Sequence, residues 1–320
     1  MLPASSTGAN GSKHPASVTV LTRRRYQVRR NPFGRARLRS VYRRVAVVTD
    51  STACLPAQLT DQLGIEVVQI QVRIGDHTDD ESRIPVPDLV SAMRENVPVA
   101  TIPPDPGAFF WTYNELAAQG VRSIVSVHVS GRQSATVEAA RTAAAQVRVP
   151  VHVVDTHTCG MSIGYAVQAA AKVAEAGGSV ERVLATAQRR FEGSTELIYV
   201  DTLEYLRRGG RIGAAAALVG GVLSMKPLLT MADGQITPLD KVLGADRALN
   251  RMLDIAIKRA GTDTVDVAVE HFDAEEKATR LLRKLRRGVP NVRQFMLTQV
   301  SSAIGAHVGP GALGITVSPV

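Results

Sequence analysis

The sequence predicts an α/β protein of two lobes, with a mostly parallel sheet in the N-terminal lobe and an α+β C-terminal lobe that carries an antiparallel sheet. Three observations predict this fold. Short apolar runs alternate with helical patterns over residues 45–160, which is typical of a parallel sheet covered on both faces. After residue 160, helices bracket isolated strands, and Asp233-Gly234 separates two short apolar segments as in a hairpin. The 320 residues, 45% of them hydrophobic, are enough for one large or two ordinary domains with a sizeable core.

Residues 1–44 form a basic extension that we expect to be mostly disordered. They are rich in Ser, Gly and Pro, and they hold 11 of the 38 Lys and Arg residues and no acid. The remaining 27 bases face 29 acids, so the body has a net charge of −2 although the whole chain has +9. The body therefore gives no reason to expect a nucleic-acid partner. The extension could be an arm for nucleic acid or for an anionic membrane, a transit peptide, or a segment without a role.

Composition also limits the compartment and the cofactors. No stretch approaches the roughly eighteen apolar residues of a membrane span, and no apolar signal-peptide core follows the first charges. The two cysteines, Cys54 and Cys159, cannot build a disulfide scaffold or a Cys-rich metal site. We therefore expect a cytoplasmic protein with no stable membrane insertion, no cofactor and no metal.

The N-terminal lobe is predicted over residues 45–160. Its strands are expected in "VAVVTDST", "GIEVVQIQV", "VRSIVSVHVS" and "VPVHVVDT". Helices are expected over residues 106–120 and 134–147, the second with Ser134 as its N-cap. Open parallel sheets bind ligands at the carboxyl ends of their strands, so polar residues there are the first candidates for a site.

The C-terminal lobe is predicted over residues 161–320. A long helix closed by Gly177 and Gly178 is followed by two helices, "VERVLATAQRRFEG" and "LEYLRRGG", which bracket the strand "LIYV". A hairpin is expected in "PLLTMADGQITPLDKV". The strands "TVDVAVEHF", "VRQFMLTQV" and "LGITV" alternate with helical stretches around residues 245–260 and 273–287. Two lobes of this kind predict a cleft between them.

Sequence signatures of common enzyme classes are missing. The chain has no Gly-x-x-x-x-Gly-Lys-Ser/Thr phosphate loop, no Gly-x-Ser-x-Gly nucleophile elbow, no His-Glu-x-x-His and no Cys-x-x-Cys. The glycines of "RRGGRIGAAAALVGG" do not follow the dinucleotide-binding spacing. Asp50 and Asp155 both end strands and could act as an acid and base pair, although aspartates at such positions commonly cap the following turn. We therefore expect a binding protein without catalytic activity of its own.

Four residues have the right chemistry to hold a carboxylate. Thr101 begins "TIPPDPGAFF", a loop stiffened by prolines, and Ser134 opens a helix whose free N–H groups favour an anion. Arg211 lies in the glycine-rich "RRGGRIG", and His307 lies in the glycine turn of "GAHVGPGALGITV". Two hydroxyls, a guanidinium and an imidazole can clamp a carboxylate. Each residue also has a plainer interpretation: a helix or turn cap for the hydroxyls, and a solvated side chain for the arginine and the histidine.

Taken together, several stretches resemble the DegV family of bacterial fatty-acid-binding proteins, from Val45 to about Val317. The resemblance is carried by "VAVVTDSTACLP", "TIPPDPGAFF", "VHVSGRQSAT" and "VDTHTCGMSIGYAV", and most specifically by "LEYLRRGGRIG", "LSMKPLLTMADGQI" and "GAHVGPGALGI". It implies that the protein binds one long-chain fatty acid and buries the tail between the two lobes. It also implies that the carboxylate is presented to a separate ATP-dependent fatty acid kinase, which makes the acyl phosphate.

By the same resemblance, the carboxylate ligands fall on Thr101, Ser134, Arg211 and His307. Lys226 matches a typical family lysine, although a structural ion pair would explain it as well. Ser130 replaces Ser134 if the alignment shifts in "VHVSGRQSAT".

Departures from the family pattern surround the expected carboxylate site. Ile102 and Pro103 stand where the family usually has Ser-Gln, and Gly131, Gln133 and Ala135 alter the pattern around Ser134. These substitutions make the surroundings of the carboxylate bulkier and more apolar, which could change the ligand or weaken the contacts with its anion. The alternative function is that of an enzyme or small-molecule kinase subunit with an architecture similar to dihydroxyacetone kinase, in which His307 would act as nucleophile or base.

Overall fold

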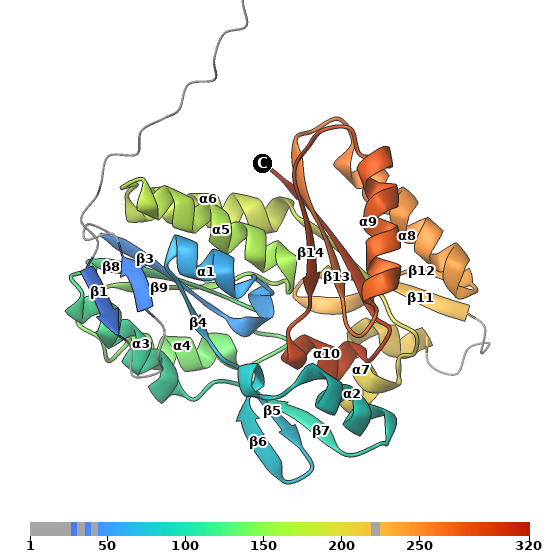
Figure 1. Ribbon diagram of the computed structural model, residues 1–320, viewed down its shortest axis with the longest axis horizontal. Coiled ribbons are helices and arrows are strands. Elements are labelled where there is room, and N and C mark those ends of the chain that lie inside the picture. The colour runs from blue at the N-terminus through green and yellow to red at the C-terminus, as the bar shows by residue number, and fades with distance from the viewer. Residues whose placement is uncertain (1–26, 31–35, 40–43, 219–224) are drawn as a thin grey trace, which may run out of the picture. The chain divides into compact units, whose positions relative to one another are not determined.

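A computed structural model gives the structure of the protein (Figure 1). It describes residues 27–30, 36–39, 44–218 and 225–320. The contacts divide the chain into two units with a boundary between Val41 and Tyr42. The second unit contains both predicted lobes.

The first unit contains one antiparallel strand pair. Its strands are β1 (Gln27–Arg30) and β2 (Ala36–Arg39), and Val28 lies opposite Leu38. The sequence predicts mostly disorder here. Two strands of four residues are too short for the alternation of apolar and polar side chains to be recognised in the sequence. The rest of the predicted disordered extension, apart from Arg44, lies outside the described residues.

The first sheet of the second unit confirms the predicted parallel sheet. Its strand order is β4-β3-β8-β9, and every pairing is parallel. The strands are β3 (Val45–Asp50), β4 (Ile65–Val68), β8 (Ser123–His128) and β9 (Val151–Asp155). All of β3 is buried, and its successive side chains enter opposite cores, as the period of two requires.

Helices cover both faces of this sheet (Figure 1). One face carries α1 (Ala57–Leu63), α5 (Met161–Glu175) and α6 (Val180–Gly193), and the other carries α3 (Pro106–Ala118) and α4 (Thr136–Ala144). The sequence analysis placed residues 161–193 in the C-terminal lobe. In the structure, Ile163 and Val183 share a core with Val47 of β3. Helices α5 and α6 therefore belong to the N-terminal lobe, and the C-terminal lobe begins after α6.

The second sheet is antiparallel except at one pairing. Its order is β12-β11-β10-β15-β13-β14, and β13 and β14 run parallel. The strands are β10 (Thr195–Tyr199), β11 (Met225–Ala232), β12 (Gln235–Leu243), β13 (Val265–His271), β14 (Val292–Gln299) and β15 (Leu313–Pro319). Asp233 and Gly234 join β11 to β12, both with positive φ, which confirms the predicted hairpin.

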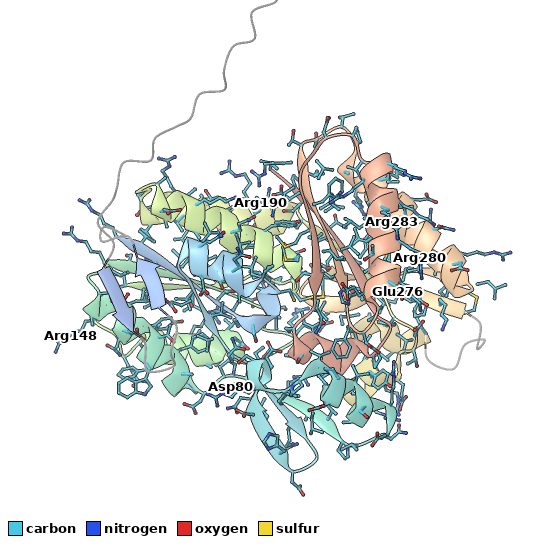
Figure 2. The ribbon with its side chains drawn as sticks, in the orientation of Figure 1. Asp80, Arg148, Arg190, Glu276, Arg280 and Arg283 are labelled. Atoms are coloured by element: carbon cyan, nitrogen blue, oxygen red, sulfur yellow. The ribbon has the colours of Figure 1, made fainter. Side chains whose placement is uncertain are left out.

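Two amphipathic helices, α8 (Ala245–Ala260) and α9 (Glu275–Gly288), cover one face of the second sheet. On α9, Leu281 and Leu285 are buried, whereas Glu276, Arg280 and Arg283 are exposed on the outer side (Figure 2). Among the residues that the structure describes, no helix combines the length and the apolar character needed to cross a membrane.

A small third sheet, β6-β5-β7, was not predicted as a separate sheet. It consists of β5 (Gln71–Ile74), β6 (His77–Asp80) and β7 (Val99–Ile102), with α2 (Val86–Arg94) beside it. The single strand predicted in "GIEVVQIQV" is therefore wrong, because its two halves, β4 and β5, join different sheets. One apolar run cannot show this, because strand pairing depends on residues distant in the sequence. Short helices α7 (Glu204–Arg208) and α10 (Ser302–Val308) complete the surroundings of the site.

Candidate functional site

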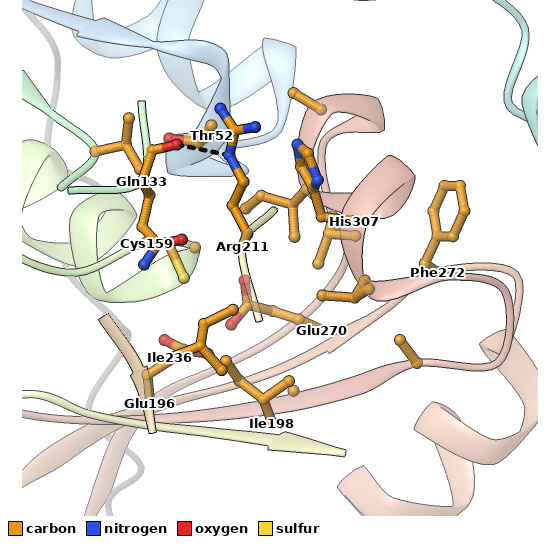
Figure 3. A pocket seen from close by; sticks show the side chains of 18 of the residues that line it. Thr52, Gln133, Cys159, Glu196, Ile198, Arg211, Ile236, Glu270, Phe272 and His307 are labelled. Atoms are coloured by element: carbon orange, nitrogen blue, oxygen red, sulfur yellow. Dashed lines mark hydrogen bonds between the residues drawn. The ribbon is translucent and has the colours of Figure 1, made fainter. Parts of the chain in front are cut away.

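A pocket lies where the three sheets of the second unit meet (Figure 3). The empty space in and around it, including open solvent at its mouth, is about 880 Å³. Much of its wall is apolar and includes Ile70, Val129, Ile198, Leu206, Ile236 and Phe272. All four residues predicted to hold a carboxylate also line it: Thr101, Ser134, Arg211 and His307. A mostly apolar pocket with a few convergent polar groups is the usual form of a small-molecule site.

Thr101 and His307 meet across the pocket wall. Thr101 Oγ1 lies 2.8 Å from His307 Nε2, although the two residues are far apart in the sequence. Nδ1 of the same ring is buried and has no hydrogen-bond partner among the described residues. It faces the backbone of Gly209, where any side chain would clash with the ring. The absence of a side chain at Gly209 is therefore what lets the imidazole occupy this position.

The positive charge of Arg211 affects the protonation of His307. Burial and, to a smaller extent, the positive charge of Arg211 lower the pKa of His307 to about 4. The imidazole is therefore neutral at neutral pH. Arg211 Nε donates to the carbonyl of Gln133 at 3.0 Å (Figure 3). Its Nη1 donates to the carbonyl of Gly209 at 2.7 Å. Within the described part of the chain, Nη2 donates to no protein acceptor, which leaves it free for an anion.

Ser134 lines the pocket, but it does not cap a helix as predicted. Helix α4 begins at Thr136 with Ala135 at the N-cap position and without a side-chain cap. The backbone N–H of Ser134 donates to Ser130 in a turn that precedes the helix, and its Oγ lies 2.8 Å from Thr136 Oγ1. The prediction was wrong because the turn delays the start of the helix by two residues.

The local settings of two other site residues also differ from the prediction. Thr101 belongs to strand β7 and not to a proline-stiffened loop, which starts after Ile102. His307 belongs to the last turn of α10, and the glycine turn begins only at Gly309, with φ of 82°. Glycines around "AHV" predict a turn locally, whereas packing of α10 against the small sheet extends the helix to Val308.

The two secondary candidates, Ser130 and Lys226, do not line the pocket. Ser130 is buried and its Oγ donates to the carbonyl of Gly234 at 2.8 Å. Lys226 Nζ donates to the carbonyl of Asp201 at 2.8 Å. Both side chains are already engaged in structural contacts, so the structure does not support either as a ligand in this pocket.

The interpretation of Asp50 and Asp155 as an acid and base pair is wrong. Asp50 caps the following turn by accepting from the backbone N–H of Thr52, and Asp155 accepts from those of Gly131 and His157. Both aspartates instead fit the alternative interpretation from the sequence, in which an aspartate at the end of a strand caps the following turn. Nor does any group of three His, Cys, Asp or Glu side chains in the described residues come together to hold a metal ion.

Asp50 belongs to a buried network that resembles a catalytic triad. Its Oδ2 lies 2.9 Å from His128 Nδ1, and His128 Nε2 lies 2.7 Å from Ser126 Oγ. Burial alone would raise the pKa of Asp50, but hydrogen bonds from His128, Thr52 and the Val129 backbone hold it below the ordinary value. All three members of this network are fully buried, and none lines the pocket. The network therefore has a structural role.

Sequence reasoning missed Glu196 and Glu270, which line the pocket. Glu196 lies on β10 and Glu270 on β13, and both are buried. A signal was present, because each acid interrupts a strand that is otherwise mostly apolar, in "TELIYV" and "VDVAVEHF". An acid inside a buried strand indicates either a paired charge or a polar group with a function.

Comparison with known proteins adds a family to this geometry. The model of the DegV family, described as a family of uncharacterised proteins, matches residues 44–320. The chain belongs to the DegV family. A DegV domain-containing protein from Streptomyces coelicolor is 46% identical over 277 residues, which cover 86% of this chain and 99% of the relative.

Solved DegV structures share the fold of this DegV protein. A DegV family protein from Thermus thermophilus, for which fatty acid binding is described, superposes with a TM-score of 0.82 at 30% identity. The match covers 87% of this chain and 100% of that one. DegV from Bacillus subtilis, described as a fatty acid binding protein, has a TM-score of 0.80 at 27% identity, with 87% and 100% covered. The two-lobed fold predicted from the sequence is thus confirmed.

Proposed function

We propose that this DegV protein binds a long-chain fatty acid without catalysing a reaction on it. The acyl chain occupies the apolar pocket, and Thr101, Ser134, Arg211 and His307 hold the carboxylate. One observation carries the proposal: these four polar residues come from four separate segments and converge on a single pocket with a largely apolar wall. The fatty acid binding described for the Thermus thermophilus and Bacillus subtilis relatives supports it.

The two parts of the ligand would contribute differently. A chain of about sixteen carbons, at ~0.8 kcal/mol per buried methylene, offers roughly 10 kcal/mol of gross transfer free energy, and the loss of freedom on binding offsets part of it. Tail burial would therefore supply most of the affinity. The charge-assisted contact with Arg211 would orient the acid and select it over an alcohol or an ester. Neutral His307 would take part through hydrogen bonding and not through charge.

We further propose that the bound carboxylate is presented to an ATP-dependent fatty acid kinase, which makes the protein an acyl carrier. This proposal rests on the resemblance to the DegV family. It is consistent with the missing signatures of ATP-binding and hydrolytic enzymes in the sequence. The cytoplasmic location predicted from the sequence would place the carrier beside such a kinase.

Native mass spectrometry of the purified protein tests the binding proposal. We expect one fatty acid mass, or uptake of added palmitate or oleate, and reduced occupancy by that ligand in Arg211→Ala and His307→Ala. The matched control is Arg207→Ala, because Arg207 is an exposed arginine of the same segment that pairs with Glu204 and does not line the pocket. A wild-type protein that stays empty when fatty acid is added would contradict the proposal.

The kinase step needs a separate experiment. The loaded protein is mixed with a bacterial fatty acid kinase and ATP, and acyl phosphate is measured. Formation of acyl phosphate only when this protein is present supports the carrier role. Ligand binding without any acyl phosphate would leave the binding proposal intact and contradict the carrier proposal.

A further inference from the structure

Two carboxyl groups interrupt the apolar wall of the pocket. Glu196 is 5% exposed and Glu270 is 1% exposed, and both line the pocket together with Ile198 and Ile236 (Figure 3). They lie on β10 and β13, the strands on either side of β15. Thr316 of β15 stands between them, with its Oγ1 2.6 Å from Glu196 Oε2 and 2.7 Å from Glu270 Oε2.

These contacts require a proton on one of the two carboxyl groups. A threonine hydroxyl has one hydrogen and can donate to only one of the two oxygens. The two carboxyl groups also hydrogen-bond to each other, with a protonated Glu196 donating to Glu270. Burial raises the pKa of both groups, and repulsion from Glu270 raises that of Glu196 further. The proton is therefore shared within the pair, and the remaining carboxyl oxygens present hydrogen-bond acceptors to the pocket.

The protein satisfies this pair only in part. Ser162 Oγ donates to Glu196 Oε2 at 2.8 Å, and the backbone N–H of Met161 donates to Glu270 Oε1 at 2.9 Å. Among the described residues, no Lys, Arg or His forms an ion pair with either carboxyl group. A plain alkyl chain packed against these oxygens offers them no hydrogen bond, which is unfavourable.

We propose that the pocket selects a fatty acid whose chain carries a hydroxyl group, and that Glu196 and Glu270 bind this hydroxyl. The inference rests on the proposed function, because it names the class of fatty acid that the same pocket takes. A hydroxyl can donate to a carboxyl oxygen of the pair, which an alkyl chain cannot do. The negative charge left on the pair also disfavours the ligand's own carboxylate there, which directs the head group to Arg211.

The test is competition between matched fatty acids for the full-length protein. The probes are hexadecanoic acid, its hydroxy derivatives with the hydroxyl moved along the chain, and the corresponding oxo derivatives. We expect at least one hydroxy isomer to bind about tenfold tighter than the parent acid, as a hydrogen bond to a charged group allows. The oxo derivative at that position should gain less, because it can accept a hydrogen bond but cannot donate one.

Variants separate this effect from general changes in the pocket. In Glu196→Met with Glu270→Met, the preference for the hydroxy isomer should fall to less than about twofold while the parent acid still binds. Glu196→Gln keeps the size of the side chain and its ability to hydrogen-bond, so it is less disruptive to folding, and it should retain part of the preference. Met231→Leu is the matched control, because Met231 lines the same pocket without a carboxyl group, and it should keep the full preference.

The outcomes distinguish this inference from the function on which it rests. If the parent acid binds and no hydroxy isomer outcompetes it, the inference is wrong and the proposed function stands. A preference that is unchanged by Glu196→Gln and by the double variant also overturns it. If neither type of acid binds the wild-type protein, the proposed function fails and this inference fails with it.

Discussion

Two histidines of this protein have opposite surroundings. His128 is fully buried, and both ring nitrogens have partners, Asp50 on one side and Ser126 on the other. His307 has one partner, Thr101, while its Nδ1 is buried without any among the described residues. His128 does not line the pocket, whereas His307 does.

The hydrogen-bond partners of the two histidines indicate that His128 contributes to stability and His307 to ligand binding. Buried polar atoms normally have hydrogen-bond partners, and a complete network such as that of His128 holds strands β3 and β8 in one arrangement. An incomplete set of contacts beside a pocket costs stability and is therefore more easily explained by a ligand. The resemblance of Ser126, His128 and Asp50 to a triad shows that residue types alone do not identify a site, because access is also required.

The largest expected effect is the loss of stability in His128→Ala. This change leaves the Asp50 carboxylate buried without its principal partner, and breaking a buried pair in this way costs about 3–5 kcal/mol in the free energy of unfolding. Urea denaturation measures it. The control His157→Ala removes an exposed histidine, with 62% of its side chain accessible, and should change stability by less than about 0.5 kcal/mol. A loss below about 1 kcal/mol in His128→Ala would contradict the structural role.

The second effect is on binding and not on stability. His307→Ala should weaken fatty acid binding about tenfold, because a contact with the carboxylate is lost. Its free energy of unfolding should fall by much less than that of His128→Ala, because His307 has only one protein partner to lose. Titration of a fluorescent fatty acid, paired with urea unfolding, measures both quantities. Equal losses of stability in the two variants would remove the distinction between the two histidines.

The third prediction concerns pH. The pKa of His307 is about 4 in the folded protein and about 6.5 in an unfolded chain, so the unfolded state binds more protons between these values. His307 therefore removes stability as pH falls through this window. Relative to His307→Gln, the wild-type protein should lose about 2–3 kcal/mol in the free energy of unfolding between pH 6.5 and pH 4. The comparison must be relative, because burial raises the pKa of Glu81 to about 7 and acts in the opposite direction. Parallel curves for the two proteins would contradict the prediction.

The smallest effects come from the hydroxyl partner of each histidine. Ser126→Ala removes a hydrogen bond inside the buried network and should cost about 1 kcal/mol of stability with no change in affinity. Thr101→Val removes the partner of His307 Nε2 at the pocket and should weaken fatty acid binding about threefold with little change in stability. The same two measurements decide the outcome. If Ser126→Ala weakened binding and Thr101→Val lowered stability instead, the roles assigned to His128 and His307 would be wrong.

The elements that were predicted correctly are those with a local cause. The buried strand "VAVVTDST", the hairpin at Asp233-Gly234 and the long helix before Gly177 follow from apolar periodicity and turn chemistry, which act over a few residues. The DegV resemblance also came from local motifs, and it named four residues that the fold does bring to one pocket.

Which segments meet depends on packing between distant parts of the chain. The approach of Glu196 to Glu270 depends on the strand order β10-β15-β13, the contact of Thr101 with His307 joins residues 206 positions apart, and the turn before α4 displaces Ser134 from the helix cap. The physical reason is that strand order and cavity shape result from packing between residues far apart in the chain, whereas propensity and periodicity report only on near neighbours. Secondary structure could thus be predicted here, but the second polar cluster of the pocket could not.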